Sequence, residues 1–120
     1  MRNRSMPRLR GAGRRMAGVG GFALMALPVN TVAPATDTNS PTVGNPITCD
    51  SGTWLNSPTS FAYFWRRAGN NPVGNPAAEH LQTYIPHISD FPIPLFCIVT
   101  ATNAAGSTDA NSNTTNPVGL

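Results

Sequence analysis

The chain is 120 residues long, which is enough for one domain with a single hydrophobic core and too short for two. All eight basic residues are arginines, and six of them lie in the first fifteen positions, at Arg2, Arg4, Arg8, Arg10, Arg14 and Arg15. Beyond position 15, two arginines stand against five acidic residues, so the positive charge belongs to the head of the chain. After position 28, Pro, Gly, Asn, Thr and Ser dominate and lysine is absent. This composition disfavours helices and predicts an all-β chain of short strands joined by turns.

The first 27 residues differ from the rest of the chain. Residues 1–15 are rich in Arg and Gly, and residues 16–27 (MAGVGGFALMAL) are apolar but interrupted by glycines. A positive stretch followed by about a dozen apolar residues has the order of a secretory signal, and it is shorter than the roughly twenty residues that cross a bilayer. The only good small-x-small cleavage site, residues 33–35 (APA), would remove the expected first strand. We therefore expect residues 1–27 to form an extended basic arm that docks onto a larger assembly, with an export signal or anchor and an inert tail as the alternatives.

The chemistry of the arm suits a protein partner. Arginine forks pair with carboxylate or phosphate groups, and the apolar segment can fill a groove on a neighbouring subunit. Nucleic acid is the competing partner for a basic segment. No aromatic residues are interleaved with the arginines to stack on bases, and the rest of the chain is acidic. No nucleic acid is therefore expected among the partners.

Strand patterns begin after the arm. Residues 28–35 (PVNTVAPA) predict an edge strand, because proline cannot donate to a central ladder. Residues 45–54 (NPITCDSGTW) predict a second strand, with a turn at residues 51–52. Period-two alternation places Ile47 and Cys49 on one face of this strand.

The clearest strand pattern spans residues 60–67 (SFAYFWRR). Alternation places Phe61, Tyr63 and Trp65 on one face of it. Residues 68–78 (AGNNPVGNPAA) are expected to be a loop, because they contain Asn-Pro and Gly-Asn turn pairs.

Three further segments complete the pattern. Residues 81–85 (LQTYI) predict a short strand, and residues 93–102 (IPLFCIVTAT) form the most β-prone stretch. The latter places one set of side chains inward, namely Leu95, Cys97, Val99 and Ala101. Residues 103–106 are expected to form a hairpin turn and residues 107–116 a polar final strand. From these inward faces we expect a core that contains Trp65, Tyr63, Phe61 and Val99.

Several stretches together have a familiar arrangement. They are residues 51–54 (SGTW), 63–67 (YFWRR), 83–84 (TY), Asp90 and 97–107 (CIVTATNAAGS). Residues 29–115 resemble the immunoglobulin-like repeat of bacterial surface proteins and of tailed-phage virion proteins, including head decoration and tail accessory proteins. The resemblance implies an immunoglobulin-like antiparallel β-sandwich over residues 28–120, preceded by the extended basic N-terminal arm over residues 1–27. Because this module occurs on many carriers, it indicates fold more strongly than function.

The resemblance also bears on the two cysteines. Cys49, Trp65 and Cys97 occur in the order that places a bridge between facing strands, with the indole packed on it. A disulfide between Cys49 and Cys97 is therefore possible and would stabilise by about 2–4 kcal/mol. A buried pair of free thiols is the alternative, because virion proteins mature in a reducing cytoplasm. The chain departs from antibody domains at Leu95, which stands where they carry a corner tyrosine, and we expect Asp90 to be a turn-forming carboxylate.

Residue patterns that carry catalysis are not found in the sequence. His80 and His87 are the only histidines, and neither has a carboxylate or cysteine at metal-ligand spacing, so we expect two exposed loop residues. No phosphate-binding loop, serine nucleophile elbow or pair of carboxylates occurs. Arg66 and Arg67 are expected to be solvated charges at a strand end. The sequence therefore predicts a protein that is not an enzyme, with no catalytic, cofactor-binding or metal-binding residues and no cofactor.

The resemblance implies a structural or accessory component of a tailed-phage virion, as a head decoration or a neck or tail accessory protein. Its partners would be capsid, neck or tail proteins of the same particle, bound through the arm in many copies. Weak attachment of the domain to cell-surface glycans would come with the same resemblance. The alternative is a secreted or anchored bacterial binding domain whose first 27 residues direct export. The expected location is the virion, or in the alternative the outside of the cell or its surface.

Overall fold

The computed structural model describes residues 25–120, and the prediction of an all-β fold is confirmed within them. The six arginines of the predicted arm lie outside the described residues. Short 3₁₀ turns at Pro76–Ala78 (η3) and Ile88–Asp90 (η4) are the only helical elements in this part of the chain. The strands are β2 (Val29–Val32), β3 (Ile47–Thr48), β4 (Thr53–Leu55), β5 (Ser60–Arg67), β6 (Asn71–Pro72), β7 (Thr83–Tyr84), β8 (Leu95–Asn103) and β9 (Gly106–Asn111).

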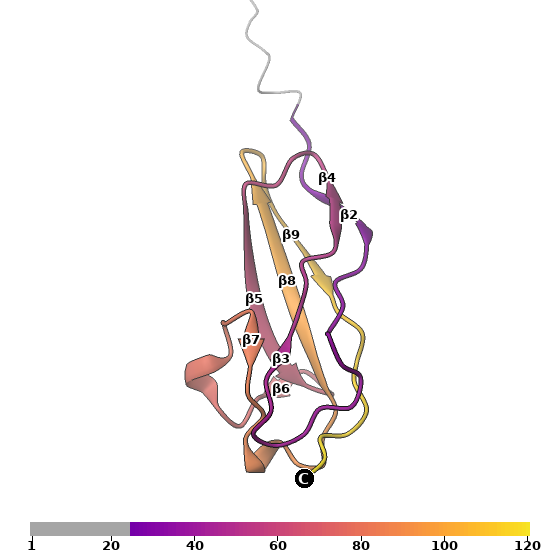
Figure 1. Ribbon diagram of the computed structural model, residues 1–120. Coiled ribbons are helices and arrows are strands. Elements are labelled where there is room, and N and C mark those ends of the chain that lie inside the picture. Colours follow the sequence, from indigo (N-terminus) through magenta and orange to yellow (C-terminus); the bar gives the residue numbers. More distant parts are fainter. Residues whose placement is uncertain (1–24) are drawn as a thin grey trace, which may run out of the picture.

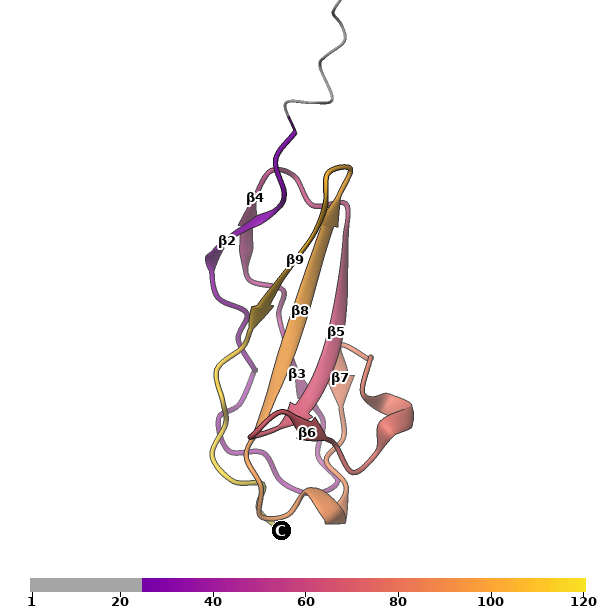
Figure 2. The same ribbon diagram turned by 180° about the vertical axis from the view of Figure 1, so that it is seen from behind.

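The strands form three antiparallel sheets in two layers. The larger sheet has the order β6-β5-β8-β9, and the smaller ones pair β2 with β4 and β3 with β7. Figures 1 and 2 show the two small sheets one beyond the other along the long strands β5 and β8. β2 and β4 lie at the end where the described chain begins, and the C-terminus lies at the opposite end.

The long strands follow the alternation of their side chains. β5 occupies the predicted residues 60–67, and β8 begins two residues later than predicted, at Leu95. Pro94 precedes that start and has no N–H to donate to a ladder. In β8, the residues Leu95, Cys97, Val99 and Ala101 are fully buried, whereas Ile98 and Thr100 between them are only half-buried.

The other elements are shorter than the sequence pattern predicts. Residues 45–54 divide into β3 and the start of β4, because the chain turns at Gly52 between them. Gly52 has a φ of 74°, and an added Cβ would lie 2.3 Å from the carbonyl oxygen of Val32. The predicted loop at residues 68–78 contains β6, which pairs with the end of β5, and the turn η3. The hairpin turn at residues 103–106 connects β8 to β9, with Asn103 opposite Gly106.

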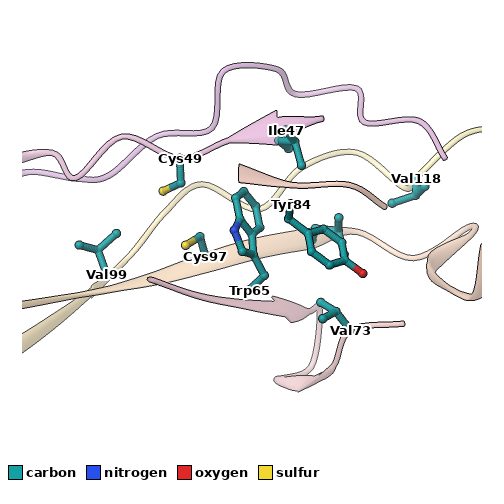
Figure 3. Packing of buried hydrophobic residues seen from close by; sticks show 9 residues of the cluster. Ile47, Cys49, Trp65, Val73, Tyr84, Cys97, Val99 and Val118 are labelled. Carbon is teal, nitrogen blue, oxygen red and sulfur yellow. The ribbon is translucent and has the colours of Figure 1, made fainter. Parts of the chain in front are cut away.

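The core lies between the two layers. It consists of Ile47, Cys49, Trp65, Val73, Tyr84, Leu95, Cys97, Val99 and Val118, and Figure 3 shows eight of them with labels. The indole of Trp65 is central: it stacks on the Tyr84 ring at 6.0 Å between centroids, and its Nε1–H donates to the Leu81 carbonyl at 2.8 Å. Tyr63 is half-buried and packs against the cluster from outside.

The expected core position of Phe61 is wrong. Its side chain is 40% exposed, although it shares a face of β5 with the fully buried Trp65. Phe61 lies near the first end of β5, where the opposite layer contains only the narrow β2–β4 pair. Its ring has one aromatic neighbour, Trp54, with centroids 6.4 Å apart. Alternation predicts the face of a residue correctly, but burial also requires a covering layer at that point along the strand.

Candidate functional site

The two cysteines face each other across the layers. Cys49 follows β3 and Cys97 lies in β8 directly opposite Trp65, so the three side chains meet in the core. Both are buried free thiols in this structure, which is the alternative that the sequence left open, and the bridge stays a prediction. A hydrogen bond with Cys97 and burial together raise the pKa of Cys49 far above its ordinary value. A buried protonated thiol is a poor nucleophile, so this pair is suited to packing or to a bridge.

A buried carboxylate lies near the C-terminal end of the domain. Asp90 is fully buried at the end of η4, and each of its oxygens accepts two hydrogen bonds. Oδ1 accepts from Arg67 Nε at 2.9 Å and from the Gly74 backbone N–H at 2.7 Å. Oδ2 accepts from the Tyr84 hydroxyl at 2.5 Å and from the His87 backbone N–H at 2.9 Å. We call Asp90 and these four donors the Asp90 cluster.

The electrostatics of the Asp90 cluster favour the ionised carboxylate. Burial by itself disfavours the charge, but the hydrogen bonds from Tyr84, His87, Arg67 and Gly74 outweigh it and hold the pKa of Asp90 below its ordinary value. Burial and the bond to this carboxylate raise the pKa of Tyr84. An Asp90 with both oxygens fully engaged has no free acceptor for a substrate proton. Asp90 therefore connects β5 and β7 to the loops around them and stabilises their arrangement.

The Asp90 cluster corrects the interpretation of Arg67. The sequence predicts a solvated charge at the end of β5, but the Arg67 side chain is only 21% exposed and is ion-paired with Asp90. Arg67 is partly buried because it lies two residues after Trp65 in β5 and therefore on the same inward face, where its guanidinium meets Asp90. Its Nη2 also donates to the Ser89 carbonyl at 2.6 Å. Gly74 packs closely against the same group, since an added Cβ there would lie 2.1 Å from Ser89 Oγ and 3.1 Å from Arg67 Nη2.

The two histidines lie in exposed loops and belong to different groups. The His80 ring stacks on Phe64 at 4.8 Å, and its Nε2 lies 3.2 Å from Glu79. Next to the Asp90 cluster, Nδ1 of His87 accepts from the Ser89 backbone N–H at 3.1 Å and lies 2.8 Å from Ser89 Oγ. Among residues 25–120, no group of three or more His, Cys, Asp or Glu side chains is placed to hold a metal ion. No helix within the same residues is long and apolar enough to cross a membrane.

The best candidate for a functional site is the end of the domain where residues 25–27 enter it. Asn103 is almost fully buried there, and its amide Nδ2 donates to the carbonyls of Ala26 and Asn56, both at 2.8 Å. Its Oδ1 accepts from the Ala105 N–H at 2.8 Å, so the side chain is fully used. Asn56 Nδ2 in turn donates to the Leu27 carbonyl at 2.7 Å. We call these bonds the entry clamp.

Apolar side chains surround the entry clamp on the outside. Leu27 and Val29 flank the fully buried Pro28, and Leu55 pairs with Val29 across the β2–β4 sheet. Leu27, Val29 and Leu55 are between 47% and 55% exposed, and Met25 is 43% exposed. We call these four side chains the apolar face. Sequence patterns could not reveal this face, because a strand with one exposed apolar side has the same alternation as a strand with one buried apolar side.

Comparisons with protein-family models, with curated proteins and with solved structures found no match for this chain.

Proposed function

We propose that residues 28–120 are an immunoglobulin-like β-sandwich and that the protein is an accessory component of a tailed-phage virion, docked through residues 1–27. Two features support the fold. Trp65 and Cys97 are cross-strand neighbours in one layer, and Cys49 faces them from the other. This is the Cys, Trp, Cys arrangement of such sandwiches, with antiparallel strands in both layers.

The observation that carries the functional proposal is the placement of the two ends. The chain enters the domain at the clamped end, and the C-terminus and the loops around η4 lie at the other end (Figure 1). A domain attached to a particle through residues 1–27 would therefore present the end with η4 outward. The entry clamp fixes the direction in which the domain continues from its attachment. Head, neck and tail surfaces are all compatible with this arrangement.

The test uses the full chain and purified particles. Serine in place of all six arginines of the arm is expected to abolish co-sedimentation with particles, because the paired charges that hold the arm are lost. Arg66→Ser is the matched control, since this arginine lies on the domain and contacts Asn70. It is expected to sediment with the particles as the wild type does. Wild-type co-sedimentation of the six-serine protein would contradict docking through the arm.

If the protein is instead an exported bacterial domain, a signal is removed by cleavage, and the only good cleavage site in the sequence is residues 33–35. Cleavage after Ala35 would remove β2 and separate Ala35 from Asp50, whose side chain and backbone both bond to it. We therefore expect the mature protein to keep β2. The intact mass of protein isolated from its natural source measures this, and a mass that begins after Ala35 would favour the export alternative.

A further inference from the structure

The apolar face gathers four exposed apolar side chains at the end where the chain enters the domain, and a second group, Ile85, Ile88 and Phe91, is exposed around η4 at the other end. No charged residue occurs in residues 25–36 or 51–65, the two segments from which it is built. Trp54, the neighbour of Leu55 in β4, packs against the core, so Leu55 and its cross-strand partner Val29 lie on the outer side of this sheet. Exposed apolar groups that adjoin one another mark sites of association. A partner of matching chemistry would bury these four side chains.

The chain itself contains a segment of that chemistry. Residues 16–24 (MAGVGGFAL) are uncharged and apolar and directly precede Met25, the first residue of the apolar face. We propose that residues 16–24 of one copy of this chain pack on the apolar face of a second copy. Nine extended residues span about 30 Å, which is longer than the short β2–β4 sheet that they would cover.

The entry clamp explains why the cover comes from another copy. Asn103 and Asn56 hold the carbonyls of Ala26 and Leu27, and the described chain begins beyond the end of the β8–β9 hairpin (Figures 1 and 2). A segment of the same copy would have to reverse immediately at Met25 to reach the face beside it. A segment that continues away from the domain reaches a facing copy without reversal. Reciprocal exchange between two copies buries both faces and closes a symmetric pair.

This inference extends the proposed docking role of residues 1–27, and it divides the arm into an arginine part that holds the particle and an apolar part that holds a neighbour. It is tested with the pure full-length protein, without particles. Failure of self-association would leave docking of the arginines to particles unaffected, and failure of co-sedimentation would leave self-association unaffected.

The first experiment measures association by sedimentation velocity. The wild-type chain is expected to form dimers at micromolar concentration. Leu55→Lys and Phe22→Lys should each raise the dimer dissociation constant by at least about tenfold, because each buries an unpaired charge in the contact. Leu81→Lys is the control, since Leu81 is 57% exposed but lies between η3 and β7, outside the apolar face. It should dimerise as the wild type does. A monomeric wild type, or a Leu55→Lys protein that dimerises normally, would overturn the proposal.

The second experiment identifies the contact. A Phe22→Cys protein is mixed with an isotope-labelled Leu55→Cys protein under mild oxidation, and the products are analysed by mass spectrometry. The proposal predicts a disulfide between the two introduced cysteines that joins one labelled and one unlabelled chain. Each protein retains the buried Cys49 and Cys97, so the peptide map must assign the linked positions. Dimers without this cross-link would place the contact elsewhere and overturn the proposal.

Discussion

The two ends of the domain use polar side chains in different ways. At the end near the C-terminus, the Asp90 cluster buries a charge and joins segments that are far apart in the sequence. At the entry end, Asn103 holds only backbone carbonyls and an N–H of neighbouring loops, with apolar side chains exposed around it. Exposed apolar side chains occur at both ends, with Ile85, Ile88 and Phe91 around η4, so the ends differ in their polar groups: one buries an ion pair, and the other fixes the path of the chain through hydrogen bonds to its backbone.

Loss of Asp90 should be among the most destabilising changes. Asp90→Ala leaves the partly buried Arg67 without its carboxylate and the fully buried Tyr84 hydroxyl without its acceptor. We expect unfolding in guanidinium chloride to show a loss of about 3–5 kcal/mol. Asp109→Asn is the control, because Asp109 is exposed and bonds only to the Thr100 hydroxyl at 2.6 Å. Equal stability of the two variants would remove the contrast between the ends.

A pair of aromatic substitutions tests the same contrast along a single strand. Trp65→Ala removes the central indole of the core and should cost about 3–5 kcal/mol. Phe61→Ala removes a side chain on the same face of β5 that is 40% exposed, and it should cost only about 1 kcal/mol. Both are measured by denaturant unfolding of the full chain. Similar losses would mean that Phe61 is covered in solution, as the sequence pattern alone suggests.

The sequence was most informative where alternation is long. β5 and β8 run for eight and nine residues, and both were predicted within two residues at each end. β6 was not predicted, because Asn71 and Pro72 carry turn signals and pair only where the end of β5 brings a partner. The inward phase of Cys49, Trp65 and Cys97 follows from alternation, but the exposure of Phe61 depends on the opposite layer.

The polar sites were less accessible to sequence reasoning. Arg67 and Asp90 are 23 residues apart in the sequence, and only the fold brings the two side chains into contact. Asp90 was expected to form a turn, and its capping of η4 through the His87 N–H is that turn. Of its other three donors, Tyr84 is six residues away, whereas Gly74 and Arg67 are 16 and 23 residues away. In the sequence, Asn103 looks like an ordinary hairpin residue. Its hydrogen bond to the Ala26 carbonyl could not be predicted, because the two residues are 77 positions apart.

Oxidation of the thiols should have an intermediate effect on the shared core. If Cys49 and Cys97 join, the unfolding free energy should exceed that of the reduced protein by about 2–4 kcal/mol. Intact-mass measurement without reductant on protein from particles should show the bridge. Replacement of both cysteines by alanine removes the dependence on reductant and is the control. Free thiols in every particle preparation would refute the bridge.

Acid should weaken the end that contains the Asp90 cluster. The pKa of Asp90 is lower in the folded protein than its ordinary value, so its contribution is fully present above about pH 4–5 and is lost as the pH falls through the folded pKa. Urea unfolding between about pH 7 and pH 2.5 should therefore show a fall in stability at the acid end of the range. Asp90→Ala should lack this part of the fall. An identical pH profile in the variant would show that the carboxylate is not stabilised as the geometry implies.

Loss of the entry clamp should have a small effect on global stability and the most local effect on structure. Asn103→Ala removes both donors to the carbonyls of Ala26 and Asn56, and we expect a loss of about 1–2 kcal/mol. Asn103→Asp keeps an acceptor for the Ala105 N–H but also lacks the donors, so it should lose a similar amount if the donors are what matters. Amide hydrogen exchange should accelerate at residues 27–30 and 104–106, while Gly74 and His87 in the Asp90 cluster keep their protection. Because the two ends share one core, acceleration at both would mean that they unfold as one unit and that the entry end has no separate role.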